Sequence, residues 1–181
     1  MIEVEIKIRT DLESAELKLM NNGFEPDVHV KETDIYFDNV NGDIRGNDTA
    51  LRIRTIKYPD SAISRSYITY KGNRFDDVSM TRPEYESSIS NADDVARILE
   101  ALGYSPVKPT VIKERSRYVK EDISACLDRV EGLGDFLELE ILTDEDTKDA
   151  ALARLWKTLE LLGYDRSETT TVSYLSMLQM K

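Results

Sequence analysis

The chain has 181 residues, of which 40% are hydrophobic and 33% charged, and its formal net charge is −11. This composition indicates a folded globular protein, and the acidic balance argues against general binding to nucleic acid or to anionic membranes. One cysteine cannot form a disulfide within the chain, and no stretch approaches the ~18 apolar residues of a membrane helix, so we expect a cytoplasmic protein.

Alternation of apolar and polar residues, which is typical of strands, dominates the chain. In chain order it predicts strands at residues 2–9, 28–38, 49–57, 63–71, 83–90, 107–120, 122–131 and 135–143. Helical spacing predicts three helices at residues 11–22, 92–102 and 147–162, each ending at a glycine suited to a left-handed cap. Residues 57–65 resemble a hairpin connection, and without any flexible linker we expect a single domain over residues 1–181.

The first predicted strand has one charged face and one apolar face. In the stretch "EVEIKIR", Glu3, Glu5 and Lys7 alternate with valine and isoleucine, and alternate side chains of a strand point to opposite faces. On a single strand, such a charged face is ordinarily solvated.

Other strands carry the same alternation, but with the charges sorted by sign. Arg52 and Arg54 share one face, and so do Glu138 and Glu140. Like charges two residues apart lie only ~7 Å from each other along a strand. Carboxylate pairs provide oxygen ligands for divalent cations, and clustered arginine and lysine bind phosphate. The sorting therefore predicts a site for a metal ion together with a phosphate compound.

A closed sheet would bring these faces together. If the apolar faces turn outward beneath the helices, the charged faces line the interior, and a barrel of about eight strands can hold one small ligand. We therefore predict an α+β fold: a closed eight-stranded antiparallel β-barrel with a charged interior, flanked by about three α-helices.

In this order, the charged motifs resemble those of the CYTH family, the triphosphate tunnel enzymes that include class IV adenylyl cyclases and thiamine or inorganic triphosphatases. The resemblance runs from residue 3 to about residue 178 and is greatest to the class IV adenylyl cyclase branch. The matching motifs are Glu3-x-Glu5-x-Lys7, Arg52-x-Arg54, Lys71 before a glycine, Arg82-x-Glu84-x-Glu86, Lys113-x-Arg115, and Asp128 followed by Glu138-x-Glu140.

The resemblance implies a role for each matching residue. The triphosphate would be bound by Lys7, Arg52, Arg54, Lys71, Arg82, Lys113 and Arg115. Mg²⁺ or Mn²⁺ would be held by Glu3, Glu5, Asp128, Glu138 and Glu140. The candidate catalytic residues are Lys7, Lys71 and Asp128. The expected substrate is ATP, thiamine triphosphate or tripolyphosphate; we expect no nucleic acid or membrane partner, and the resemblance is compatible with a homodimer.

The reaction itself stays open at this point. Conversion of ATP to cyclic AMP and pyrophosphate is the leading expectation, a triphosphatase is the first alternative, and a binding module without turnover is the second. A metal-bound hydroxyl or a lysine of lowered pKa are both candidates for the general base. Glu84 and Glu86 are either ligands or structural partners of the cations, whereas Arg9 and Arg117 are expected at the rim.

Overall fold

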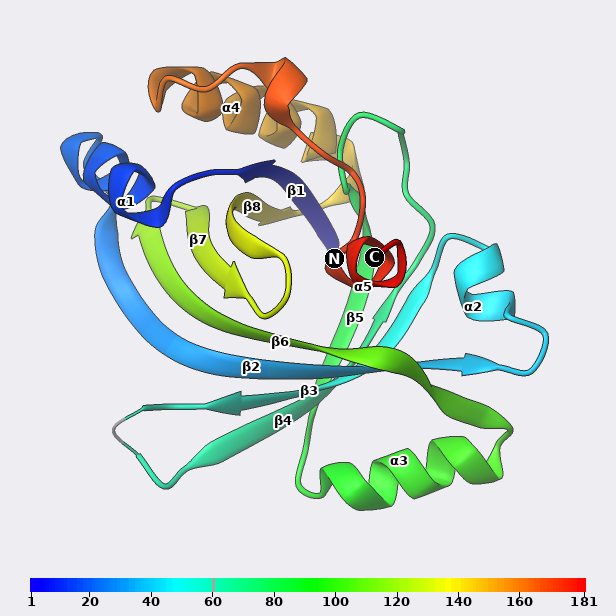
Figure 1. The fold of residues 1–181 in the computed structure, drawn as a ribbon. Helices are drawn as coiled ribbons and strands as arrows, with labels where there is room; N and C mark the ends of the chain where they lie inside the picture. The colour runs from blue at the N-terminus through cyan, green and yellow to red at the C-terminus, as the bar shows by residue number, and fades with distance from the viewer. Residues whose placement is uncertain (60) are drawn as a thin grey trace.

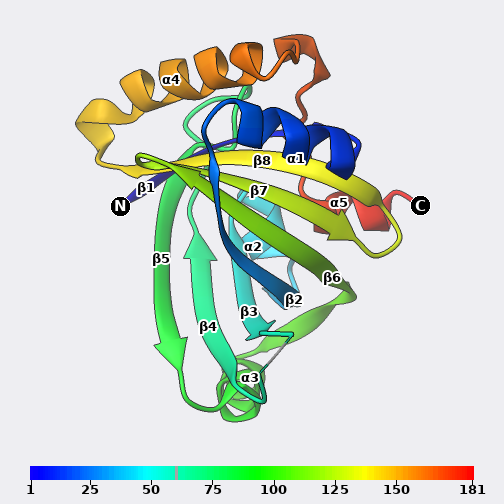
Figure 2. The same cartoon turned by 90° about the vertical axis from the view of Figure 1, so that its left-hand side faces the viewer.

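The computed structural model describes residues 1–59 and 61–181, and the strands within them form one closed antiparallel barrel (Figures 1 and 2). The order around the barrel is β1-β5-β4-β3-β2-β6-β7-β8. The eight strands of this described part are β1 Ile2–Arg9, β2 Glu25–Asn39, β3 Ala50–Lys57, β4 Ser64–Lys71, β5 Arg82–Ile89, β6 Tyr104–Lys120, β7 Ile123–Val130 and β8 Gly134–Thr143. The predicted fold class is therefore confirmed. Residue 60, in the predicted hairpin connection between β3 and β4, lies outside the described residues.

Five α-helices accompany the barrel in the described residues: α1 Leu12–Asn21, α2 Asp43–Gly46, α3 Ala92–Ala101, α4 Lys148–Leu161 and α5 Tyr174–Gln179. The three predicted helices correspond to α1, α3 and α4. The other two have four and six residues, which is too short for helical spacing to become visible in the sequence. None of the described helices has the length and apolar content needed to cross a membrane.

The ends of the three longer helices follow the local signals in the sequence. The side chain of Asn91 accepts hydrogen bonds from the first backbone N–H groups of α3, as an N-cap does. Gly23, Gly103 and Gly163 follow α1, α3 and α4 with φ values of 79°, 91° and 76°. These left-handed conformations favour glycine and turn the chain sharply out of each helix.

The largest hydrophobic core lies between the outer wall of the barrel and the helices. α1 and α4 cover β1, β7 and β8 (Figure 2), where Val4 and Ile6 pack with Leu155 and Trp156. A smaller core joins α3 to β2 and β3. Because the apolar side chains of these strands are used on the outside, their charged side chains must point into the barrel.

A third cluster fills one end of the barrel interior. Phe136 lies two residues before Glu138 on β8 and therefore shares its inward face. It packs edge-on against Tyr174 of α5, with 4.9 Å between the ring centroids. The short helix α5 thus reaches the interior from the end of the chain, where it packs against β6 (Figure 1).

The outward packing of the barrel predicts a specific stability effect. Leu139→Ala removes a fully buried side chain from the core beneath α1 and α4, and we expect a loss of about 2–5 kcal/mol in the free energy of unfolding. Leu161→Ala on α4 is the control, because Leu161 is 63% exposed and should change stability by less than ~0.5 kcal/mol. Urea denaturation measures the free energy of unfolding of both variants. Equal losses would contradict a hydrophobic core between the outer wall of the barrel and the helices.

Candidate functional site

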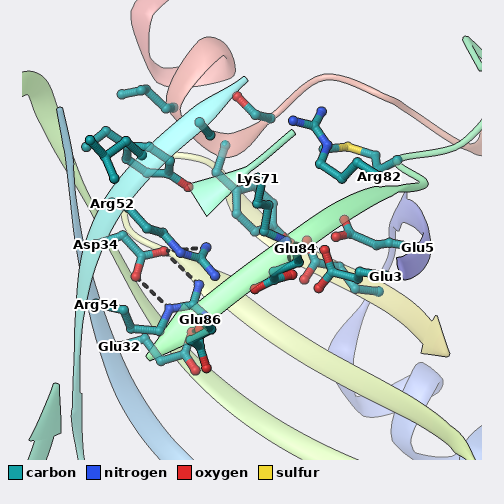
Figure 3. Close-up of a pocket in the computed structure, with 18 of the residues that line it drawn as sticks. Glu3, Glu5, Glu32, Asp34, Arg52, Arg54, Lys71, Arg82, Glu84 and Glu86 are labelled. Carbon is teal, nitrogen blue, oxygen red and sulfur yellow. Dashed lines mark hydrogen bonds and ion pairs between the residues drawn. The ribbon is translucent and has the colours of Figure 1, made fainter. Parts of the chain in front are cut away.

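The barrel encloses a cavity of about 1790 Å³ that is lined by the inward-facing rows of charged side chains. Eleven of the twelve predicted site residues line it: Glu3, Glu5, Lys7, Arg52, Arg54, Lys71, Arg82, Lys113, Arg115, Glu138 and Glu140. Figure 3 shows several of them converging on one space from different strands. The charges that are sorted by sign in the sequence therefore meet in the interior of the fold.

Strand register places bases opposite acids. In the pairing of β1 with β8, Lys7 lies opposite Glu138 and Glu5 opposite Glu140. The Lys7 Nζ atom lies 3.0 Å from a Glu138 oxygen and 3.2 Å from a Glu5 oxygen. Although burial lowers it, the two carboxylates raise the pKa of Lys7 above its ordinary value, so this lysine carries a positive charge at neutral pH.

Asp128 does not line the cavity but lies behind it, fully buried. Its oxygens accept hydrogen bonds from Lys113 Nζ at 2.8 Å, from Arg115 Nε at 2.6 Å and from the Tyr174 hydroxyl at 3.1 Å. Both oxygens are thus occupied by protein donors. This geometry makes Asp128 a counter-charge that holds Lys113 and Arg115 in place.

A second pair of buried carboxylates, Glu32 and Asp34, was missed at the sequence level. Asp34 accepts hydrogen bonds from Arg54 Nε and Nη2, each at 2.7 Å, and from Arg52 Nη1 at 3.3 Å (Figure 3). Glu32 lies 3.1 Å from Arg54. Although burial would raise its pKa, Arg54 and then Lys113 lower the pKa of Glu32 to about 2. The sequence does contain a sign of this pair, because Glu32 and Asp34 are two residues apart and therefore share one face of their strand, as the other charged pairs do.

Three carboxylates form an acidic corner, defined as Glu3, Glu5 and Glu140, on β1 and β8. One oxygen of each lies within 4.8 Å of the others. Burial, and after it Glu3 and Glu138, raise the pKa of Glu140 to about 8 against the opposing effect of Arg115. Burial and the nearby Glu138 also raise the pKa of Glu5. The three carboxylates are therefore crowded together, although Lys71 pairs with Glu3 and Arg115 lies 3.6 Å from Glu140.

The acidic corner fits a divalent metal ion. Oxygen atoms of carboxylates are the ligands that Mg²⁺ and Mn²⁺ prefer, and three of them converge here. The buried Oε1 atom of Glu5 accepts no hydrogen bond from the described residues and has only the ion pair with Lys7 Nζ at 3.2 Å. Glu138 lies outside the corner, and its pKa is well below the ordinary value because Lys7 and Lys113 outweigh the effect of burial.

Two arginines that line the cavity have hydrogen-bond donors without an acceptor. Within the described part of the chain, the Nε atoms of Arg52 and Arg82 are buried and have no hydrogen-bond acceptor. The nearest carboxylate oxygen to Arg82 belongs to Asp48, 3.9 Å away. Buried donors are normally satisfied, and phosphate oxygens are good acceptors for arginine. These two side chains are therefore suited to an anion that enters the cavity.

The remaining charged residues have ordinary partners. Glu84 lies 3.1 Å from Lys71, which fits a structural partner of the cations. Glu86 accepts a hydrogen bond of 2.8 Å from Thr69, which is not a cation. Arg9 donates a hydrogen bond to the carbonyl of Leu133 at 2.8 Å. Arg117 is half-exposed at the mouth of the cavity and is bonded to Asp27, as expected for a rim residue.

The role of Asp128 as a counter-charge predicts a large stability effect. Asp128→Asn removes the carboxylate closest to Lys113, which also accepts two hydrogen bonds from Arg115, and removing one partner of a buried ion pair costs about 3–5 kcal/mol. Asp135→Asn is the matched control, because its partner Arg129 is exposed and such surface pairs contribute ~0–1 kcal/mol. Denaturation of both variants measures the difference, and a mild effect of Asp128→Asn would contradict this role.

The raised pKa of Glu140 predicts that metal binding releases protons. Near pH 7 this group, with a pKa of about 8, holds a proton that a bound cation must displace, so we expect release of roughly one proton per ion. Near pH 9 the release should fall toward zero, because the carboxylate is then already ionised. Calorimetric titration with Mg²⁺ in buffers of different ionisation enthalpy measures the protons, and Glu140→Gln is the control. Binding without proton release near pH 7 would contradict the prediction.

Comparison with known proteins shows which family the chain belongs to. A Methanocaldococcus jannaschii protein, provisionally named an adenylate cyclase, is 37% identical over 179 residues, covering 98% of each chain. An adenylate cyclase of Aeromonas hydrophila is 32% identical over 150 residues, covering 80% of this chain and 71% of that protein. A Pyrococcus horikoshii structure has a TM-score of 0.88 and 33% identity, covering 98% of each chain.

A more distant structure, from Hippeastrum, is similar in fold, with a TM-score of 0.67 and 17% identity over 99% of this chain and 95% of that one. That protein is described as an adenylyl cyclase candidate with a dominant triphosphatase activity. The CYTH domain matches residues 1–174 of this chain. On this match, and on the relatives that are 37% and 32% identical, the chain belongs to the CYTH domain family.

Proposed function

We propose that the protein is a divalent-metal-dependent enzyme that acts on a triphosphate substrate inside the barrel. One observation carries the proposal: the acidic corner and the unsatisfied donors of Arg52 and Arg82 line the same cavity. A triphosphate that travels with a divalent cation needs both kinds of group, because the metal requires carboxylate oxygens and the phosphates require cationic donors.

In this proposal the acidic corner holds Mg²⁺ or Mn²⁺, which when bound would neutralise charge on the phosphate oxygens. The cations of the wall bind the triphosphate, namely Lys7, Arg52, Arg54, Lys71, Arg82, Lys113 and Arg115. Asp128 and Glu138 act as positioning residues, since protein cations already occupy them.

Lys7 and Lys71 are proposed to stabilise charge rather than to accept a proton. Against the effect of burial, Glu138 raises the pKa of Lys7 and Glu3 raises that of Lys71 above the ordinary lysine value. A lysine that acts as general base needs a lowered pKa. Both groups are therefore suited to neutralising the negative charge that develops on phosphate oxygens during phosphoryl transfer.

The leading reaction is that of an adenylyl cyclase. The ribose 3′-hydroxyl releases its proton to solvent and its oxygen attacks the α-phosphorus of ATP, forming the cyclic phosphodiester and expelling pyrophosphate. The names of the two relatives that are 37% and 32% identical support this reaction. It makes the same demands on the cavity as any phosphoryl transfer, which are positioning and stabilisation of charge.

The second candidate is a triphosphatase. In that reaction a water molecule attacks the terminal phosphorus, and the diphosphate leaves. The Hippeastrum protein, which is similar in fold and has a dominant triphosphatase activity, supports the view that one barrel can serve this chemistry. Both reactions use the same cations and the same metal site, so the products distinguish them.

Incubation with ATP and Mg²⁺ or Mn²⁺, followed by separation of the products, tests the proposal. We expect cyclic AMP and pyrophosphate, whereas ADP and phosphate would assign the triphosphatase reaction; EDTA should abolish either. Arg52→Ala and Glu3→Gln should each lower turnover by about 10²-fold or more, as loss of a single charge-stabilising group does. Arg129→Ala, at an exposed ion pair with Asp135, is the control and should change little.

Absence of turnover with ATP, thiamine triphosphate and tripolyphosphate would overturn the enzymatic proposal. If the protein still bound a non-hydrolysable ATP analogue under those conditions, and Arg52→Ala abolished that binding, a binding module without turnover would be the correct function.

A further inference from the structure

The ring of Tyr174, on the short helix α5, faces two lysines of the cavity. Its centroid lies 4.4 Å from the Nζ atom of Lys7 and 5.3 Å from that of Lys113. Lys7 is on β1 and Lys113 is on β6, and around the barrel these strands are separated by β8 and β7. Pairing between neighbouring strands therefore does not fix the distance between the two ammonium groups, whereas the ring contacts both.

Two contacts fix the orientation of this buried ring. Phe136 packs against it, with 4.9 Å between the ring centroids and 62° between the ring planes. The hydroxyl of Tyr174 donates a hydrogen bond of 3.1 Å to Oδ2 of Asp128. Burial, and after it the charges of Glu138 and Asp128, raise the pKa of Tyr174 well above its ordinary value. The hydroxyl therefore keeps its proton and remains a donor to Asp128.

The ring differs in charge from the other group that lies near both lysines. That group is Glu138, which is 3.0 Å from Lys7 Nζ and 4.0 Å from Lys113 Nζ. A carboxylate attracts a lysine but also repels a polyanion. The face of an aromatic ring carries partial negative charge, which attracts an ammonium group without adding a formal charge. The ring can therefore hold the lysines without opposing the entry of phosphate.

We propose that Tyr174 is a positioning residue of the phosphate-binding site, whose ring holds the ammonium groups of Lys7 and Lys113 in place through cation–π contacts. This inference rests on the proposed function, in which both lysines bind the triphosphate. The helix α5 is then part of the anion site, although its tyrosine acts on the lysines and not on the ligand. The contribution of the ring should therefore be the same for every ligand that carries the triphosphate.

The test measures the dissociation constants of the imido analogues of tripolyphosphate and of ATP by calorimetry with Mg²⁺ present. Tyr174→Leu keeps apolar bulk and removes the ring, and it should weaken both analogues by roughly 10- to 30-fold, the size of a cation–π contact away from water. Tyr174→Phe keeps the ring and loses only the hydroxyl. It should stay within about threefold of the wild type, because the cation–π contacts remain.

Fluorinated phenylalanines at position 174 separate the charge of the ring from its shape. Fluorine withdraws electrons from the face of the ring and weakens its attraction for a cation with little change in size. The affinity for the tripolyphosphate analogue should fall with each added fluorine, a trend that a purely structural residue would not show. Leu178→Ala is the matched control, because Leu178 packs in the same cluster as Tyr174 but lies outside the cavity lining. It should lower the melting temperature and leave the affinity within about twofold of the wild type.

The outcomes separate the inference from the function on which it rests. If the wild type does not bind the tripolyphosphate analogue, or if Lys7→Met and Lys113→Met both leave its affinity unchanged, the proposed function fails. If the lysine variants weaken binding but fluorination of the ring at position 174 does not, the positioning role of Tyr174 is overturned. Equal losses of affinity in Tyr174→Leu and Leu178→Ala would also overturn it, because the loss would then follow the stability of α5.

Discussion

The mutual compensation of buried charges is the constraint on which the rest of this structure depends. An ionised side chain that is removed from water is costly unless an opposite charge and hydrogen bonds replace the lost hydration. Here Asp34 satisfies Arg54, Asp128 satisfies Lys113 and Arg115, and Glu138 lies against Lys7. The apolar faces of the strands can then turn outward under the helices, where the cores form.

The buried charges do not compensate one another equally in all parts of the cavity. The proposed function rests on the two regions where a charge or a donor is left without a full set of partners. In the acidic corner, burial and the crowding of carboxylates outweigh the nearby cations and raise the pKa of Glu140 to about 8. Elsewhere, Arg52 and Arg82 have buried donors with no acceptor in the described structure. A divalent cation and a polyanion would complete both regions at once. Buried carboxylates such as Asp34 and Asp128 hold the lysine and arginine side chains in position before any ligand binds. Electrostatic catalysis requires this kind of preorganisation.

Much of this arrangement could be predicted from the sequence, because two-residue alternation reports which side chains share a face of a strand. It does not report which strands become neighbours. The counter-charge role of Asp128 depends on its register opposite Arg115 and on Tyr174, 46 residues away on a helix too short to predict. Glu32 and Asp34 were missed because their strand carries apolar residues on both faces: Val30 points inward, whereas Phe37 joins an outer core.

The position of a bound metal ion relative to a bound polyanion tests the central claim most directly. Crystals grown with Mn²⁺ and the imido analogue of tripolyphosphate should show an anomalous scattering peak among Glu3, Glu5 and Glu140, where the carboxylate oxygens converge. The polyanion should lie within hydrogen-bonding distance of the Nε atoms of Arg52 and Arg82. A barrel that admits neither ion, or that binds them only on its outer surface, would contradict the account.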